Sequence, residues 1–223
     1  MAEKQFVPFD TVRFESPIWN MVPVPGKPIL IIELRNDLTR NVSFSAFDYS
    51  NQEFLWREVV LPEKWWVTLL GATGDVVRMK VFESSDNPDK TSFLNIILNS
   101  GELVSTTESF TALPDEALRP AQYLDGEEEF EVVKNFLQKK LQVTPKLGAE
   151  YLVHGNYIFI SYYKGNPASF VNSFSVFTQQ GKLVLEEEIG TNLKGIGWNT
   201  FFIVNDRVFF VKNKMELVTF RIV

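Results

Sequence analysis

The sequence predicts an all-β fold with one helical insertion, arranged as a small four-bladed, propeller-like array of antiparallel meanders. Three observations support this prediction: a repeated Ser-Phe hairpin, a second hairpin before each copy, and one segment of helical period. A β-sandwich or an open barrel is the alternative, because generic hairpins give similar cues. The repeat favours the propeller, and we expect a single β-repeat domain over residues 1–223.

The repeated hairpin begins with Ser-Phe at residues 43, 92 and 173. Each copy has an apolar residue three positions after the phenylalanine and a turn seven to nine positions after the serine. In two copies the turn contains a glycine, Gly101 or Gly181, which can adopt the positive φ that tight hairpins need. The repeated unit is therefore predicted to be a β-hairpin.

A second hairpin precedes each copy, with an aromatic residue at its start and a tight turn at its centre. These hairpins span 19–34, 66–82 and 151–163, and a fourth spans 198–210 before the C-terminal segment MELVTFRIV. Two hairpins make a four-stranded meander of about 40 residues, the length of a propeller blade. The fourth blade is one strand short. We expect residues 6–14 to fill this gap by pairing with the last blade, which would close the ring.

One segment has helical rather than strand period. Apolar residues recur every three or four positions from Phe130 to Leu141, which predicts a helix over 126–141 within a helical insertion at 110–148. Asp125 and Glu128 have the spacing of a capping box. Acidic first turns and a basic last turn complement the helix dipole, so we interpret these charges as structural.

The composition excludes several classes of site. The chain has no Cys and a single His, His154, so we expect no disulfide, no cofactor and no zinc, haem or copper site. The net charge of −6 indicates no nucleic-acid partner, because that binding needs clustered Lys and Arg. Without a secretory signal or an apolar run of about 20 residues, we expect no membrane association and a cytoplasmic location.

No catalytic residue is assigned from the sequence. The nucleophile elbow, the Walker A loop and the dinucleotide-binding loop are all absent. We interpret the acidic run at 127–129 as complementing the helix dipole and the run at 186–188 as solvated charge. Residues 86–89 are interpreted as a turn, and His154 as an exposed turn residue.

Tryptophan residues recur at the starts of the repeats. Trp19, Trp66 and Trp198 each open a repeat unit, and recurrence at equivalent positions is typical of a packed interior, so we expect these three in the core. Neighbours in a strand face opposite sides, so Trp65 should point outward.

The expected site lies on a face formed by the long connections. Turns within each hairpin are short, and in an up-and-down meander the longer connections emerge at the opposite edge, where binding residues commonly concentrate. The long connections are predicted at 35–40, 61–65, 83–90, 164–169, 190–196 and the helical insertion. The candidate ligand-binding residues on this long-loop face are Arg35, Arg40, Lys64, Trp65, Asp86, Lys90, Lys164 and Lys194. Their excess of cations suits an anionic partner.

Three stretches resemble an uncharacterised bacterial family, a domain of unknown function. They are RPAQYLDGEEEFEVVKNFL, EYLVHGNYIFISYY and KGIGWNTFFIVNDRVFFV. The resemblance implies a bacterial origin and no activity. The GEL and GKL hairpins are also similar to the blade repeats of quinoprotein-type propellers, but the Trp docking motif of those repeats is missing, so quinone binding is not expected.

Three roles are consistent with these patterns. The first is a non-enzymatic domain that binds an unidentified protein or small-molecule ligand on the long-loop face. The second is a hydrolase or lyase that uses Asp and Glu at the same face, with or without calcium or magnesium. The third is a purely structural role within a complex, which would require a large apolar patch. Two carboxylates that converge in a pocket would favour the enzyme, whereas a flat or apolar face would favour binding.

Overall fold

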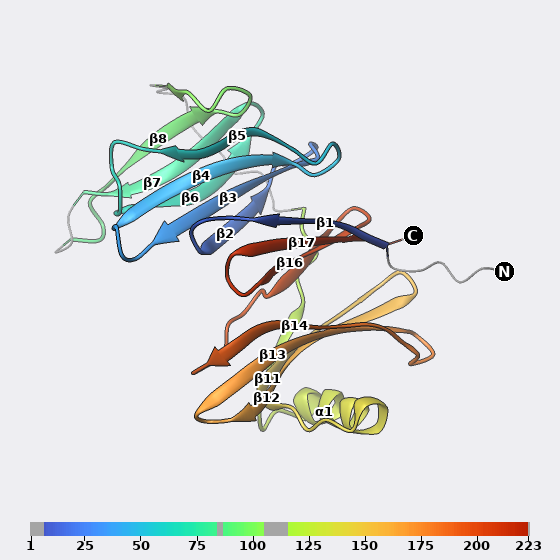
Figure 1. The fold of residues 1–223 in the computed structure, drawn as a ribbon. Helices are drawn as coiled ribbons and strands as arrows, with labels where there is room; N and C mark the ends of the chain where they lie inside the picture. Colours follow the sequence, from blue (N-terminus) through green and yellow to red (C-terminus); the bar gives the residue numbers. More distant parts are fainter. Residues whose placement is uncertain (1–6, 84–86, 105–115, 223) are drawn as a thin grey trace. The chain divides into compact units, whose positions relative to one another are not determined.

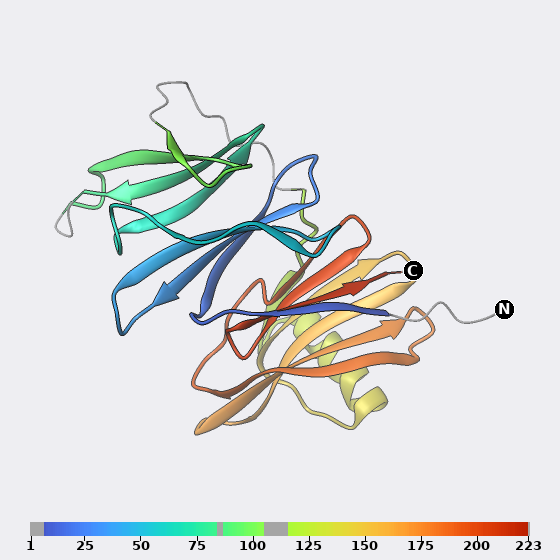
Figure 2. The ribbon, with the colours of Figure 1, turned by 45° about the horizontal axis from the view of Figure 1, so that its top comes forward.

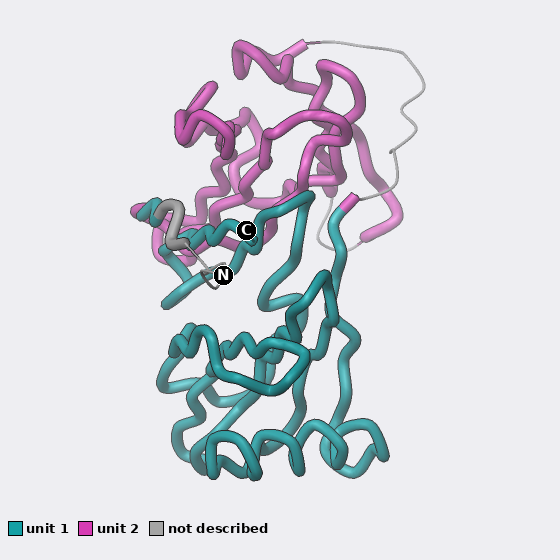
Figure 3. Tube along the Cα trace, turned by 90° about the vertical axis from the view of Figure 1, so that its right-hand side faces the viewer, with its two compact units in different colours: residues 1–13, 117–223 teal, residues 14–116 magenta. Residues whose placement is uncertain are grey.

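A computed structural model describes residues 7–83, 87–104 and 116–222, whose strands form four antiparallel sheets (Figure 1). The chain divides into two compact units, coloured separately in Figure 3. Unit 1 comprises residues 1–13 and 117–223, and unit 2 comprises residues 14–116. The predicted all-β class with one helical insertion is confirmed. The ring of four blades and the single domain over 1–223 stay predictions.

Unit 2 contains two four-stranded meanders. The first is formed by β2 (Ile18–Pro23), β3 (Ile29–Asn36), β4 (Asn41–Asp48) and β5 (Glu53–Val60). The second is formed by β6 (Val67–Thr73), β7 (Val76–Phe82), β8 (Thr91–Ile97) and β9 (Leu103–Val104). In both sheets the strands pair in chain order, so the first two predicted meanders are confirmed.

Unit 1 contains the other two sheets. The five-stranded sheet is formed by β10 (Ala121–Leu124), β11 (Lys146–His154), β12 (Tyr157–Asn166), β13 (Ser169–Thr178) and β14 (Leu183–Leu193). The last sheet is formed by β15 (Phe201–Val204), β16 (Arg207–Lys212), β17 (Glu216–Arg221) and β1 (Val7–Arg13). Strand β1 pairs antiparallel with β17, so the predicted pairing of the N-terminal segment with the last blade is confirmed. Residues from the two ends of the chain therefore share one sheet (Figure 2). The repeat did not predict β10.

Each unit has an apolar core between its two sheets. In unit 2, Ile31 of the first sheet and Met79 of the second belong to one buried cluster. In unit 1, Phe174 of the five-stranded sheet and Phe210 of its neighbour belong to another. Burial of this apolar surface is the main force that holds each pair of sheets together.

Helix α1 (Glu128–Leu141) covers the other face of the five-stranded sheet (Figure 1). Phe130, Val133 and Leu137 are its buried residues, so the predicted helix and apolar stripe are confirmed. The predicted capping box is wrong: the N-cap residue is Glu127, whose carboxylate accepts the N–H of Leu124 at 2.7 Å. Within the described ranges, no helix has the length and apolarity needed to cross a bilayer.

The long connection predicted at 164–169 is wrong, and the one predicted at 190–196 begins later than expected. Strand β12 continues to Asn166, so only residues 167 and 168 separate it from β13. Strand β14 extends through Leu193, so the connection to β15 comprises residues 194–200. Glycine and asparagine favour loops locally, but here the ladder continues, with Gly165 opposite Phe170 and Asn166 opposite Ser169. Tertiary pairing has overridden local propensity.

Gly101 is a turn glycine whose replacement we expect to be costly. Its φ is +73°, and a Cβ there would lie 2.8 Å from Cγ of the buried Trp56. Gly101→Ala should therefore lower the free energy of unfolding by about 3 kcal/mol, from left-handed strain and overpacking together. Urea denaturation measures this loss. Gly26 has a similar φ of +70° with no heavy atom within 4 Å, so Gly26→Ala should cost only about 1 kcal/mol. Equal losses would contradict the steric role of Trp56.

Candidate functional site

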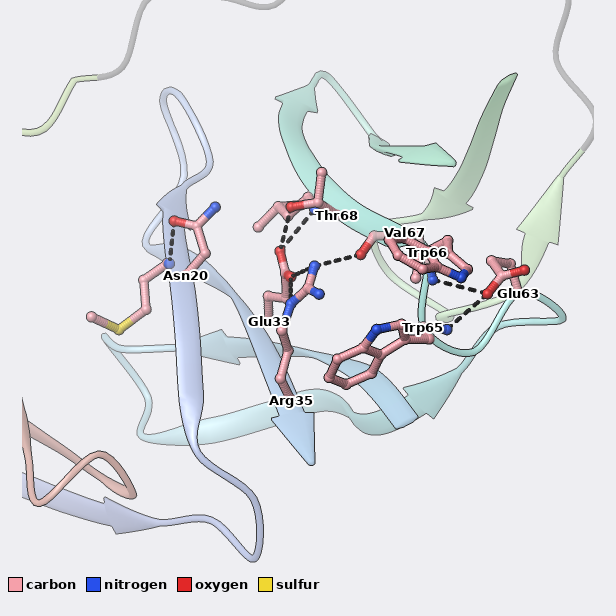
Figure 4. Close-up of polar contacts among 10 residues, drawn as sticks. Asn20, Glu33, Arg35, Glu63, Trp65, Trp66, Val67 and Thr68 are labelled. Atoms are coloured by element: carbon pink, nitrogen blue, oxygen red, sulfur yellow. Dashed lines mark hydrogen bonds and ion pairs between the residues drawn. The ribbon is translucent and has the colours of Figure 1, made fainter. Parts of the chain in front are cut away.

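A buried ion pair lies between the two sheets of unit 2 (Figure 4). Glu33 of β3 is fully buried, and its Oε1 accepts a hydrogen bond from Nε of Arg35 at 2.7 Å. The two residues are two positions apart, so both side chains lie on the same face of the strand. Oε2 of Glu33 accepts from the backbone N–H of Leu69 at 2.9 Å and from the hydroxyl of Thr68 at 3.1 Å. The carboxylate therefore joins β3 to β6.

Arg35 also stacks on two tryptophan rings. Its guanidinium carbon lies 5.1 Å from the ring centroid of Trp19 and 5.6 Å from that of Trp65. Arg40, in the turn between β3 and β4, lies 5.1 Å from the same Trp65 ring. Cations are attracted to aromatic faces at these distances. We call the series Trp19, Arg35, Trp65 and Arg40 the Trp–Arg stack.

Side chains at the outer end of this region are open to solvent. Trp19 is 66% exposed, Trp66 is 47% exposed and Leu38 is 95% exposed. Arg40 and Lys64 are exposed as well, and neither forms an ion pair with any residue that the structure describes. The surface thus combines exposed aromatic and aliphatic groups with free positive charge.

Glu63 holds the segment that carries the two neighbouring tryptophans (Figure 4). Its Oε1 accepts the backbone N–H of Trp65 at 2.8 Å and that of Trp66 at 2.9 Å. These hydrogen bonds lower the pKa of Glu63, because they stabilise the charged carboxylate. The backbone carbonyl of Lys64 accepts the N–H of Val42 at 2.6 Å, which ties the segment to β4. Both tryptophans are therefore fixed by backbone contacts.

The structure brings together part of the predicted long-loop set. Arg35, Arg40 and Trp65 meet in the Trp–Arg stack, and Lys64 precedes Trp65 in the chain. Arg35 lies within strand β3 rather than in a loop.

The other predicted residues lie elsewhere. Lys90 belongs to unit 2 but pairs with Glu83 at 3.2 Å in the β7–β8 connection. Lys164 and Lys194 belong to unit 1, where Lys164 pairs with Glu188 at 3.0 Å and Lys194 is exposed. The last candidate, Asp86, lies outside the described residues.

Several tryptophan predictions were wrong. Trp19 and Trp66 are exposed rather than in the core, and Trp65 is partly buried against the core of unit 2. Strand β6 starts only at Val67, so the alternation of a strand does not apply to the two residues held by Glu63. The sequence reasoning also missed Glu33. The sequence feature that could have revealed Glu33 is its position as the one acidic residue in the apolar run ILIIEL.

A second buried glutamate joins the two sheets of unit 1. Glu150 of β11 is fully buried and accepts the backbone N–H of Thr200 at 3.0 Å. It also accepts the N–H of Asn199 and bonds to the Thr200 hydroxyl. Burial raises the pKa of Glu150, and these hydrogen bonds oppose the rise. The residue two positions later is Leu152, so no arginine accompanies this carboxylate as Arg35 accompanies Glu33.

The raised pKa of Glu150 predicts a pH-dependent stability. The raised pKa means that the folded chain binds the Glu150 proton more tightly than the unfolded chain does. This proton therefore contributes fully to the free energy of unfolding below the ordinary pKa of 4.5, and the contribution is lost as pH rises through the higher pKa of the folded state. Glu150→Gln cannot titrate. Between pH 4.5 and 8 the unfolding temperature of the native chain should fall more than that of Glu150→Gln, as measured by calorimetry. If the unfolding temperatures of the native chain and of Glu150→Gln change equally with pH, the pKa of Glu150 is not raised by folding.

Two features of the acidic side chains bear on carboxylate chemistry. Among residues 7–83, 87–104 and 116–222, no three Asp, Glu or His side chains gather where they could hold a metal ion. Each of the two buried glutamates already accepts several hydrogen bonds that join two sheets. The exposed end of the Trp–Arg stack is therefore the stronger candidate for a functional site.

Comparison with protein families gives a match to part of the chain. Residues 25–104 match a family described as Domain of unknown function (DUF4905). The matched segment lies within unit 2 and includes Glu33, Arg35 and Arg40, but not Trp19. This match supports the expected resemblance to an uncharacterised family. The three stretches that suggested the resemblance in the sequence all lie outside the matched segment. No curated protein matches the chain. Bacterial origin and the likeness to quinoprotein repeats stay predictions.

Proposed function

We propose that this chain is a binding domain whose Trp–Arg stack recognises an acidic segment of a partner protein. One contrast supports the proposal. The charge of Arg35 is balanced by the buried Glu33, whereas Arg40, on the same Trp65 ring, is exposed and has no ion pair within the described part of the chain. Because the guanidinium of Arg40 is already held against the Trp65 ring, it should lose less conformational entropy on binding a carboxylate than a freely rotating arginine would.

The side chains of the Trp–Arg stack favour a polypeptide ligand over a sugar. Tryptophan and arginine are enriched at the residues that dominate protein interfaces. A sugar would stack on an open indole face, but Trp65 already has two guanidinium groups over its ring and Trp19 has one. Leu38 stands in the same turn as Arg40 and is 95% exposed, which supplies an apolar contact beside the charge.

The charge around the stack limits what the partner can be. Arg40 and Lys64 lie in segments that also contain Asp37 and Glu63, so the surface as a whole is not strongly cationic. We expect a partner with one or two carboxylates beside an aromatic or aliphatic residue, rather than a polyanion. Because the stack lies within unit 2, the proposal does not depend on the predicted four-bladed ring.

A peptide selection tests the proposed function. A random dodecapeptide library on phage is selected against the immobilised full chain. Retained peptides should be rich in Asp or Glu next to an apolar residue. Synthetic copies, measured by fluorescence anisotropy, should bind Arg40→Glu and Trp19→Ala at least about tenfold more weakly than the native chain.

A matched control distinguishes the loss of a contact at this surface from a general effect of the chain's net charge. Lys146 is exposed on β11 of unit 1, and Lys146→Glu makes a charge change equal to that of Arg40→Glu. Binding to Lys146→Glu should equal binding to the native chain. Selected peptides without acidic residues, or equal losses in the two charge-reversal variants, would overturn the proposal.

A further inference from the structure

Helix α1 leaves a cavity against the five-stranded sheet that it covers. The cavity has a volume of about 250 Å³ and a largely apolar wall. The helix contributes Glu129, Val132 and Phe136 to this wall, and the sheet contributes Tyr123, Tyr151 and Ile158. Val132 is 66% exposed and Glu129 is also exposed, so the cavity opens to solvent along the helix.

Three aromatic side chains line the cavity. Tyr123 and Tyr151 come from the adjacent strands β10 and β11, and Phe136 comes from the helix. Burial raises the pKa of Tyr151, and so does the neighbouring Tyr123, so the Tyr151 hydroxyl stays neutral at neutral pH. The faces of neutral aromatic rings carry partial negative charge and attract cations.

One acidic side chain completes the wall. Glu129 forms no ion pair with the residues that the structure describes, whereas Glu131 on the same helix pairs with Lys134 at 2.8 Å. Lys134 also lies 5.9 Å from the Phe130 ring, so this nearby cation is already engaged. A cation in the cavity would therefore meet an unpaired carboxylate as well as aromatic faces.

We infer that this cavity binds a free small-molecule quaternary ammonium ion. The alkyl groups of such an ion suit the apolar wall, and its positive charge suits Glu129 and the three rings. A bare metal ion would need several oxygen ligands, which this wall does not supply. A phospholipid headgroup fits less well, because its phosphate is attached close to the ammonium group and would be repelled by the carboxylate of Glu129. The volume suits a ligand smaller than a drug-sized molecule.

Choline and its neutral isostere, 3,3-dimethylbutan-1-ol, test the inference. Each is titrated into the ¹⁵N-labelled full chain and followed by ¹H–¹⁵N NMR. Choline should give saturable shifts of amides in α1, β10 and β11, and the alcohol should bind about tenfold more weakly. Val132→Trp, which places a large side chain at the exposed edge of the cavity, should abolish the choline shifts.

A pair of neighbouring acids provides the matched control. Glu129→Gln should weaken choline binding at least about fivefold, whereas Glu128→Gln should change it by less than about twofold. Glu128 is exposed on the same helix and does not line the cavity. Equal binding of choline and the alcohol, equal effects of the two variants, or no saturable shift with choline would each overturn the inference. None of these outcomes bears on the Trp–Arg stack, which lies in unit 2.

Discussion

Arg35→Ala is expected to lower the free energy of unfolding by about 3–5 kcal/mol, because it leaves a buried carboxylate without its cation. The Glu33 side chain is 0% exposed and that of Arg35 only 17%, so solvent screens the pair weakly. Thr68 and Leu69 would still donate to Glu33, but neither carries charge. Urea denaturation followed by tryptophan fluorescence measures the loss.

Arg40→Ala provides the control for this prediction. Arg40 stacks on the same Trp65 ring but is exposed, so its removal should cost about 0.5 kcal/mol or less. Adding Glu33→Gln to Arg35→Ala should recover part of the stability, since a neutral amide is less costly to bury than a carboxylate. Equal losses in Arg35→Ala and Arg40→Ala would show that the buried pair does not hold the sheets of unit 2 together.

Phe174→Ala should cost about 3–5 kcal/mol, as expected when a large side chain is removed from a core. Phe174 is fully buried in β13, and its ring centroid lies 4.9 Å from that of Phe201 and 5.1 Å from that of Phe210. Those two rings belong to β15 and β16, so Phe174 joins the two sheets of unit 1. The loss is measured by calorimetry and by faster hydrogen exchange in β13, β15 and β16.

Phe93→Ala is the matched control for the core. Phe93 is 51% exposed on β8 of unit 2, so the same truncation there should cost about 1 kcal/mol or less. A Phe174→Ala loss no larger than that of Phe93→Ala would contradict the description of the unit 1 core.

The strand order within the four meanders could be predicted because local signals specify it, whereas the added strand β10 could not. Hairpin turns such as 25–27 and 205–206 separate runs of apolar residues, and β2–β3 and β15–β16 form around them. The pairing of β1 with β17 was predictable for a different reason, since the last sheet otherwise lacked its fourth strand. Apolar residues at helical spacing predicted α1 to within two residues at its start.

The candidate site was less predictable, because it depends on which strand faces meet. Strand β3 is buried on both faces, so its sequence reads as a continuous apolar run and gives no sign of which neighbour Glu33 contacts. Trp19 was misplaced because recurrence in the sequence does not distinguish a core position from an exposed one on the opposite face. Trp65 was misplaced because backbone hydrogen bonds to Glu63, rather than strand alternation, set its direction.

The five indole N–H groups offer the most direct test of the proposed binding surface. In a ¹H–¹⁵N NMR titration of the full chain with a selected acidic peptide, the signals of Trp19, Trp65 and Trp66 should shift together, along with the Nε–H of Arg40. The signals of the buried Trp56 and of Trp198 in unit 1 should stay unchanged. Shifts confined to Trp198 or to backbone amides away from the Trp–Arg stack would contradict the account.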